Sequence, residues 1–220
     1  VAERFEYYAR ALAAKTEFWR SKRRCAGVLH FCGLGYSRHD GQTSDHFIDV
    51  GNLTYEPSFR RYVSDAFAPT GIMLDFWADD VAAGEEREVS AVVINDLYEP
   101  WKGEVRLRLL RGGETLSEQA RPCEIDPLGD GRIAFEIAAP RPPGRYRLEA
   151  ALVREGSPEV RSLRDFAVLT PDEIEARRNL AAGKSETIRF APTRARWVRM
   201  HGSERGTRFG YSLWEMGVYR

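Results

Sequence analysis

The chain has 220 residues, of which 43% are hydrophobic and 11% aromatic, which is enough apolar material for one or two folded domains and excludes a disordered chain. Its 33 lysines and arginines match 33 aspartates and glutamates, so the formal charge of +0 at pH 7 argues against broad electrostatic binding to nucleic acid or an anionic membrane. No apolar run reaches the roughly 18 residues that a membrane-spanning helix needs. We therefore expect neither a nucleic-acid nor a membrane partner.

The N-terminal part is predicted to be a helix followed by a buried strand. Residues 3–24 form the predicted helix, because apolar side chains recur at helical spacing. These side chains are Phe5, Tyr8, Leu12 and Trp19. The run Cys25–Cys32 is almost continuously apolar, which is typical of a strand buried on both faces in a parallel sheet. Cys25 and Cys32 are therefore expected to be buried, and with Cys123 they form an odd set without a recognised pattern.

A long polar loop and a second helix follow this strand. The loop spans Gly33–Glu56, and Pro57 is suited to open a helix, which is predicted over residues 57–67. The apolar side of this helix carries Phe59, Tyr62, Val63 and Phe67. Helix, strand, loop and helix form one α/β repeat. Because one repeat cannot cover its own sheet, we expect it to be the end of a parallel barrel or wound sheet whose earlier strands precede Val1.

From Thr70 onward the pattern changes to short strands with period-two alternation, separated by Gly, Pro and Asn-Asp turn signals. The predicted strands are Ile72–Trp77, Glu88–Asn95, Val105–Leu110, Arg132–Ile137, Arg145–Val153 and Leu163–Leu169. Such a series over about one hundred residues is typical of an immunoglobulin-like β-sandwich. The lack of a Cys–Trp–Cys core excludes an antibody-type domain.

The last part of the chain contains a linker and further strands. The charged segment Pro171–Arg178 is predicted to be a linker, or one helical turn capped by Thr170. Strands are then predicted at Glu186–Phe190, Trp197–His201 and Leu213–Tyr219. The chain as a whole is predicted to be mostly β with an α/β N-terminal piece.

In this order the parts resemble the C-terminal portion of a glycoside hydrolase of the family-two superfamily, which includes β-galactosidase, β-glucuronidase and β-mannosidase. Lys15–Arg20 and Cys25–Phe31 resemble the last helix and the eighth strand of the catalytic (β/α)8 barrel. Val92–Asp96 and Trp101–Gly103 resemble the sandwich that follows the barrel. The implied domains are residues 1–69 for the barrel end, 70–170 for the sandwich, 171–183 for the linker and 184–220 for the tail.

The tail resembles a different domain. Ala195–His201 and Gly210–Glu215 are similar to the closing strands of a discoidin-type (coagulation-factor C-type) carbohydrate-binding domain, and Asn179–Lys184 is similar to its opening strand. A Greek-key sandwich of that kind needs about eight strands. The tail is too short for them, so we expect a truncated discoidin-type domain.

The resemblance to the glycoside hydrolases implies a retaining enzyme, which needs two carboxylates about 5–5.5 Å apart at the ends of different barrel strands. No residue here matches the catalytic glutamate motifs of the superfamily. Both carboxylates are therefore expected upstream of Val1, and this chain alone is not expected to hydrolyse a glycoside. No cofactor is expected.

The loop after the eighth strand of such a barrel would open onto the catalytic face. Its candidates for sugar contact are His30, Tyr36, Arg38, His39 and Asp40. Tyr36 could stack on a pyranose, and Arg38 and Asp40 could bond its hydroxyls. The alternative is a solvated connector held by Asp and Ser turns, with His30 in the core.

Two other interpretations concern the acidic residues of this loop. Asp40, Asp45 and Asp49 do not suit a catalytic pair, because they share one flexible loop. His39, Asp40, Asp45 and His46 are suitable types of metal ligand, but their spacing matches no recognised motif. No metal is therefore expected.

In the tail, an aromatic side chain could stack on a sugar while an arginine bonds its hydroxyls. The candidates are Arg205, Arg208, Phe209 and Tyr211. Trp197 and Trp214 lie within predicted strands and are interpreted as core residues.

Three functions remain open, one of which is a purely structural spacer. The favoured one is the C-terminal portion of a retaining glycosidase acting on β-glycosidic bonds, with a carbohydrate and the rest of the barrel in cis as partners. The alternative is a non-catalytic carbohydrate-binding or adhesion module. A periplasmic or secreted location suits a bacterial polysaccharide-degrading enzyme, whereas three unpaired cysteines argue against an oxidising compartment.

Overall fold

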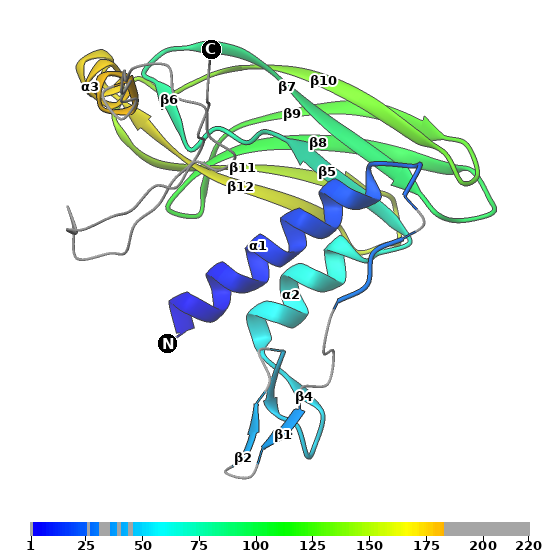
Figure 1. Cartoon of the computed structure of the whole chain (residues 1–220). Coiled ribbons are helices and arrows are strands. Elements are labelled where there is room, and N and C mark those ends of the chain that lie inside the picture. Colours follow the sequence, from blue (N-terminus) through cyan, green and yellow to red (C-terminus); the bar gives the residue numbers. More distant parts are fainter. Residues whose placement is uncertain (1, 26, 31–35, 39–40, 44–45, 183–220) are drawn as a thin grey trace, which may run out of the picture. The chain divides into compact units, whose positions relative to one another are not determined.

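The structure, a computed structural model, is mostly β with few helices (Figure 1). The described residues are 2–25, 27–30, 36–38, 41–43 and 46–182. The chain divides into two compact units, Val1–Arg177 and Arg178–Arg220. The predicted strands of the tail lie outside the described residues. No helix among those described is long and apolar enough to cross a lipid bilayer.

Two helices, α1 (Ala2–Arg20) and α2 (Pro57–Ala66), pack against each other in the first unit. Small side chains permit their close approach. The cluster buried between them consists of Ala9, Ala13, Tyr62 and Ala66. The hydroxyl of Tyr62 also donates a hydrogen bond to the Glu6 carboxylate at 2.8 Å. Both predicted helices are therefore confirmed, within a few residues at their ends.

The start of α2 follows from local sequence. Glu56 is the N-cap, and its carboxylate accepts a hydrogen bond from the backbone N–H of Phe59 at 2.7 Å. Pro57 occupies the first turn, where no backbone donor is needed.

The segment after α1 differs from the prediction. Residues 27–30 are not a strand, the side chain of Leu29 is 97% exposed, and Cys25 is exposed. The expected strand buried on both faces is therefore wrong for these residues. A strand forms only beside another strand, and no described part of the chain pairs with this segment.

Short strands occupy the predicted polar loop. One two-stranded sheet contains β1 (Tyr36–Arg38) and β2 (Gly41–Thr43), and another contains β3 (Phe47–Asp49) and β4 (Thr54–Tyr55). Stacked rings of Phe47 and Tyr55, with centroids 4.6 Å apart, hold the second sheet together.

From Thr70 to Leu169 the strands form two open sheets. The smaller sheet has the order β10-β7-β5 and contains β5 (Thr70–Asp75), β7 (Glu86–Asn95) and β10 (Asp130–Ala138). The larger has the order β6-β12-β11-β8-β9 and contains β6 (Asp80–Ala82), β8 (Trp101–Arg111), β9 (Glu114–Ile125), β11 (Gly144–Val153) and β12 (Val160–Leu169). All neighbours are antiparallel except β6, which runs parallel to β12.

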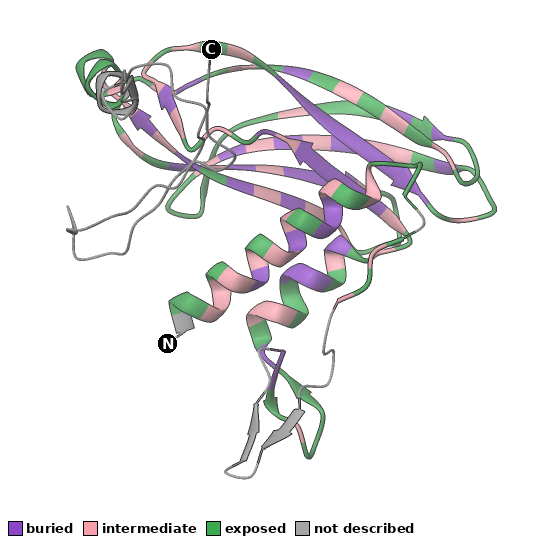
Figure 2. Ribbon diagram, in the orientation of Figure 1, coloured by how far each residue is buried: buried purple, intermediate pink, exposed green. Residues whose placement is uncertain are grey.

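One hydrophobic core joins the two sheets. The smaller sheet contributes Leu74, Val93 and Phe135, and the larger contributes Val105 and Leu148, all at most 1% exposed. Along β8 and β11, residues that face the core alternate with residues that face outward. The sequence therefore alternates between apolar and polar residues, which is the pattern from which these strands were predicted. Figure 2 shows the resulting purple runs along the strands.

Two strands of these sheets were missed by the sequence analysis. β6 is only three residues long. β9 lies at the edge of the larger sheet and is exposed along most of its length, so only Cys123 and Ile125 are buried. An edge strand of this kind has no buried face that would produce an alternating pattern.

β7 is buried on both faces because α1 covers the outer face of the smaller sheet. Met73, Val92 and Ile94 form a second apolar cluster there, against which Phe18 of α1 packs. The helices are therefore docked on the sheets rather than joined to them only through the chain.

A buried ion pair fixes this docking. The carboxylate of Glu17 accepts hydrogen bonds from the Arg164 guanidinium at 2.9 Å and from the Ser162 hydroxyl at 2.6 Å. Ser162 Oγ in turn accepts from the backbone N–H of Leu74 at 2.9 Å. The side chains of Glu17 and Arg164 are only 4% and 8% exposed. Burial raises the pKa of Glu17, although Arg164 opposes the shift.

Arg20 makes a second connection. Its guanidinium donates to the backbone oxygens of Ala66 at 2.5 Å and Ala68 at 2.8 Å, and to the Asp96 carboxylate at 2.8 Å. A Cβ atom at Gly71 would lie 2.8 Å from Arg20 Nη1, so glycine leaves the space that the guanidinium occupies. A cation at the C-terminal end of α2 also suits the helix dipole.

The predicted linker contains a helix, α3 (Pro171–Ala182). It begins with a capping box, in which Thr170 Oγ1 accepts from the Glu173 backbone N–H at 3.3 Å while the Glu173 carboxylate accepts from the Thr170 N–H at 2.8 Å. The prediction of a single capped turn found the start of this helix but not its length. Arg177 pairs with Asp80.

We expect Arg164→Ala to lower the free energy of unfolding by about 3 kcal/mol, because it leaves the buried Glu17 carboxylate without a cation. Glu17→Gln in the same chain should restore part of this loss by removing the charge. Urea unfolding at pH 7.5 measures both. The matched control is Arg145→Ala on β11, whose exposed side chain should change stability by less than about 0.5 kcal/mol. Equal losses in the two arginine variants would contradict the role of the pair.

Candidate functional site

Two histidines and several aromatic rings meet where the helices approach β3. His46, immediately before β3, is only 4% exposed, and its ring centroid lies 4.3 Å from that of Phe59 on α2. The hydroxyl of Tyr8 on α1 lies 3.4 Å from His46 Nε2. The ring of His30 lies 6.3 Å from that of His46. The predicted sugar contact His30 is thus part of an aromatic cluster rather than of a strand.

The contacts of Thr16 determine which ring nitrogen of His30 carries a proton. Its hydroxyl donates to the backbone oxygen of Leu12 at 2.9 Å, so its single proton is already used. His30 Nε2, 2.9 Å from the same hydroxyl oxygen, must therefore be the donor. In the neutral ring this leaves Nδ1 as a hydrogen-bond acceptor. Burial and the neighbouring His46 both lower the pKa of His30, so the neutral form is favoured at physiological pH.

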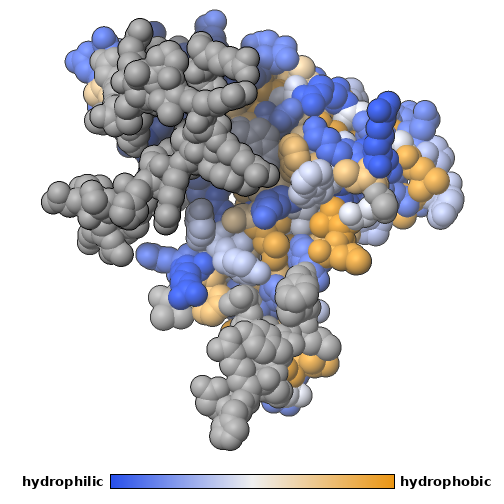
Figure 3. Space-filling model, in the orientation of Figure 1, coloured by the Kyte–Doolittle hydropathy of each residue, from blue (hydrophilic) through white to orange (hydrophobic). Residues whose placement is uncertain are grey.

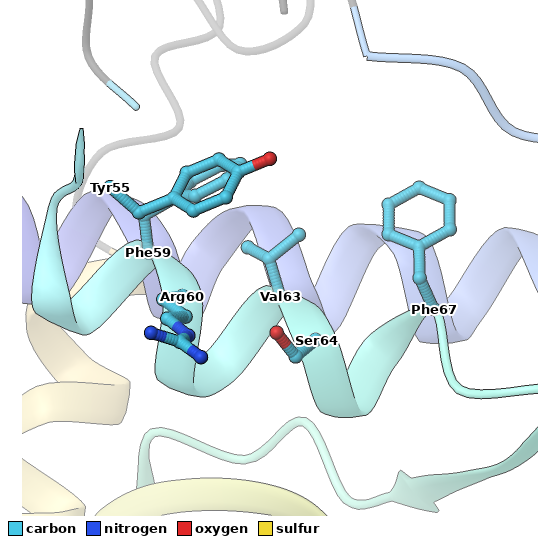
Figure 4. Close-up of a pocket in the computed structure, with 6 residues that line it drawn as sticks. All are labelled: Tyr55, Phe59, Arg60, Val63, Ser64 and Phe67. Atoms are coloured by element: carbon cyan, nitrogen blue, oxygen red, sulfur yellow. The ribbon is translucent and has the colours of Figure 1, made fainter. Parts of the chain in front are cut away.

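A shallow hollow adjoins this cluster on α2. It has a volume of about 200 Å³ and is lined by Tyr55, Phe59, Arg60, Val63, Ser64 and Phe67. Figure 4 shows the side chains of Tyr55, Phe59, Val63 and Phe67 on one side of α2, whereas those of Arg60 and Ser64 point away from it. The Tyr55 and Phe59 rings are stacked, with centroids 5.8 Å apart.

This hollow contains no carboxylate. Two acids with a raised pKa are engaged in other contacts. The buried Glu17 is held by Arg164, and the half-buried Asp65, whose pKa desolvation raises to about 6, accepts a hydrogen bond from the Arg161 backbone. Neither lines the hollow, so a carboxylate pair of the kind that cleaves glycosides is not assembled there.

The structure brings only one of the predicted sugar contacts into this site. Tyr36 and Arg38 lie on β1, where their backbones pair with Thr43 and Gly41 of β2. His39 and Asp40 fall outside the described residues, as do the tail candidates Arg205, Arg208, Phe209 and Tyr211. Among the described residues, no three His, Cys, Asp or Glu side chains gather as a metal site.

Tyr8, Thr16 and Phe59 were not identified as site residues from the sequence. Tyr8 and Phe59 belonged to apolar stripes and were interpreted as helix core. The one available signal was Thr16, because a β-branched polar residue on the buried side of a helix requires a hydrogen-bond partner.

No family model and no curated protein sequence matches the chain. Similar solved structures include a cycloisomaltooligosaccharide glucanotransferase from Paenibacillus sp., with 17% identity over 46% of this chain and a TM-score of 0.38. A β-glucosidase from Listeria innocua has 11% identity over 46% of this chain and a TM-score of 0.37. A CARDB domain from Pyrococcus furiosus, in complex with two metal ions, has 17% identity over 47% of this chain and a TM-score of 0.36.

These structures differ in how much of their own length is matched. The chain spans 14% of the glucanotransferase and 16% of the β-glucosidase, but 97% of the CARDB domain. The neighbours therefore include glycosidases, yet the similarity is too slight to support an argument about function.

His30→Gln tests the protonation of this site. The glutamine amide can keep the donor to Thr16 but cannot be protonated. Because the pKa of His30 is lowered by folding, the folded state binds fewer protons than the unfolded state just below pH 6.5, and the wild type loses stability as the pH falls through this range. We expect the variant to gain stability relative to the wild type between pH 7.5 and 5, as measured by urea unfolding. If the difference in the free energy of unfolding between the two proteins does not change with pH, the lowered pKa of His30 is contradicted.

Proposed function

We propose that this chain is the C-terminal portion of a retaining glycosidase that acts on β-glycosidic bonds, with its catalytic carboxylates upstream of Val1. The observation that supports this most is an apolar face on the helical pair that is partly exposed at its C-terminal end. Phe59, Val63 and Phe67 recur every four residues along α2 and its C-cap, and whereas Val63 is buried, Phe67 is 40% exposed. Figure 3 shows hydrophobic surface gathered over the C-terminal part of α2.

An outer helix of a (β/α)8 barrel has such a face, because it packs on the strands of the barrel. α2 already covers α1 with Tyr62 and Ala66, whereas the Phe67 ring at its C-cap is 40% exposed and accessible to a different neighbour.

The chemistry of such an enzyme would come from elsewhere. A retaining mechanism uses one carboxylate as nucleophile and another as acid and base. This chain would supply a wall of the active site, formed by the loop after the eighth strand. Just before that loop, His30 would accept a hydrogen bond from a sugar hydroxyl at Nδ1, while Tyr36, Arg38, His39 and Asp40 would provide stacking and polar contacts.

We further propose that the two sheets form an immunoglobulin-like sandwich. Their strand order, with a short β6 parallel to the last strand, supports this assignment. So does Tyr146 near the start of β11, whose hydroxyl donates to the backbone oxygen of Pro142 at 2.8 Å, as in a tyrosine corner. Leu148, two residues later, occupies the position that a core cysteine has in antibody domains. The tail would be the truncated discoidin-type domain.

The complete reading frame that encodes this chain provides the test. We expect its product to hydrolyse aryl β-glycosides with retention of the anomeric configuration, which proton NMR of the first-formed sugar detects. The 220-residue chain alone should show no turnover. A complete product that binds glycans in an affinity assay but never cleaves them would instead support the non-catalytic carbohydrate-binding or adhesion module.

A further inference from the structure

An indole ring is held in a fixed position just after β5. The side chain of Trp77 is 51% exposed, although three groups constrain it. Its Nε1 donates to the Asp75 carboxylate at 2.9 Å. The guanidinium carbon of Arg164 lies 4.3 Å from the ring centroid, and the Phe18 ring meets the indole edge-on with centroids 5.9 Å apart.

These contacts determine which part of the indole is available. Arg164 covers one face, and it is itself fixed by the buried Glu17. The opposite face is therefore the one that reaches solvent. A side chain held in this way loses little conformational entropy when a ligand stacks on it.

Polar groups border the exposed indole. The Asp75 carboxylate also accepts a hydrogen bond from Arg132 Nη1 at 2.9 Å, and the side chains of Asp75 and Arg132 are 32% and 56% exposed. Burial acts to raise the pKa of Asp75, but hydrogen bonds from Arg132 and Trp77 outweigh it and lower the pKa, so the carboxylate is ionised at neutral pH. The border thus offers both acceptor oxygens and guanidinium donors.

We propose that Trp77, Asp75 and Arg132 form a binding site for a pyranose ring of a neutral oligosaccharide. A pyranose combines an apolar C–H face, which stacks on an aromatic ring, with a rim of hydroxyls that both donate and accept. The carboxylate would repel a phosphate, which disfavours a nucleotide. The site uses none of the residues that contact substrate in the proposed glycosidase, so it is independent of that function.

The test uses the 220-residue chain and three probes: cellohexaose, laminarihexaose and xylohexaose. Isothermal titration calorimetry should show saturable binding of at least one of them. We expect Trp77→Ala to weaken it by about tenfold or more and Arg132→Ala to weaken it several-fold. Tyr98→Ala, which removes another exposed aromatic ring (88% exposed), is the matched control and should leave binding unchanged.

Trp77→Ala removes the ring that stacks on Arg164 and could therefore unfold the protein. Arg132→Ala is included because its side chain is 56% exposed, so this variant is expected to remain folded. A thermal melt of each variant shows which ones remain folded. The proposal is overturned if none of the three probes binds, or if folded Arg132→Ala and Trp77→Ala bind as tightly as the wild type. Binding that survives both variants but is lost in Tyr211→Ala would assign the sugar to the tail and would likewise overturn it.

Discussion

The contact between Glu17 and Arg164 determines how the first unit is assembled. A buried carboxylate requires a cation, and here the two partners are 147 residues apart in sequence. Their pairing sets α1 against β12, and Ser162 extends the network to the backbone of β5. Because Arg164 also stacks on Trp77, the same contact orients the exposed indole. One pair of charges therefore connects the helices, both sheets and the exposed indole.

Much of the fold could be predicted because its signals are local. The alternation of Val105, Leu107 and Leu109 reports a strand with one buried face. Pro57, which suits the first turn of a helix, predicts where α2 begins. In both cases neighbouring residues carry the information, so no knowledge of distant contacts is needed.

The remaining features depend on contacts between distant residues. The segment that contains Cys25 and Leu29 has the apolar composition of a buried strand, but both side chains are exposed. A strand is buried only when neighbouring strands pair with it, and composition does not show whether such neighbours exist. β9 lacks an alternating pattern because it lies at a sheet edge. The candidate site was found only through His30, since its contacts with Thr16 and with the ring of His46 arise when the helices and the loop come together.

The way Arg20 holds the end of α2 affects how this protein could be divided or recombined. Many multidomain proteins exchange their parts at exposed linkers that few contacts cross. Here the connection from Ala66 to Thr70 is bridged by a guanidinium that binds Ala66, Ala68 and Asp96 together. The two sheets separated at this point would expose Met73, Val92 and Ile94 and would deprive Arg164 of its carboxylate partner. The helices and the two sheets therefore depend on each other for burial, and the chain between them is a poor place to divide the protein.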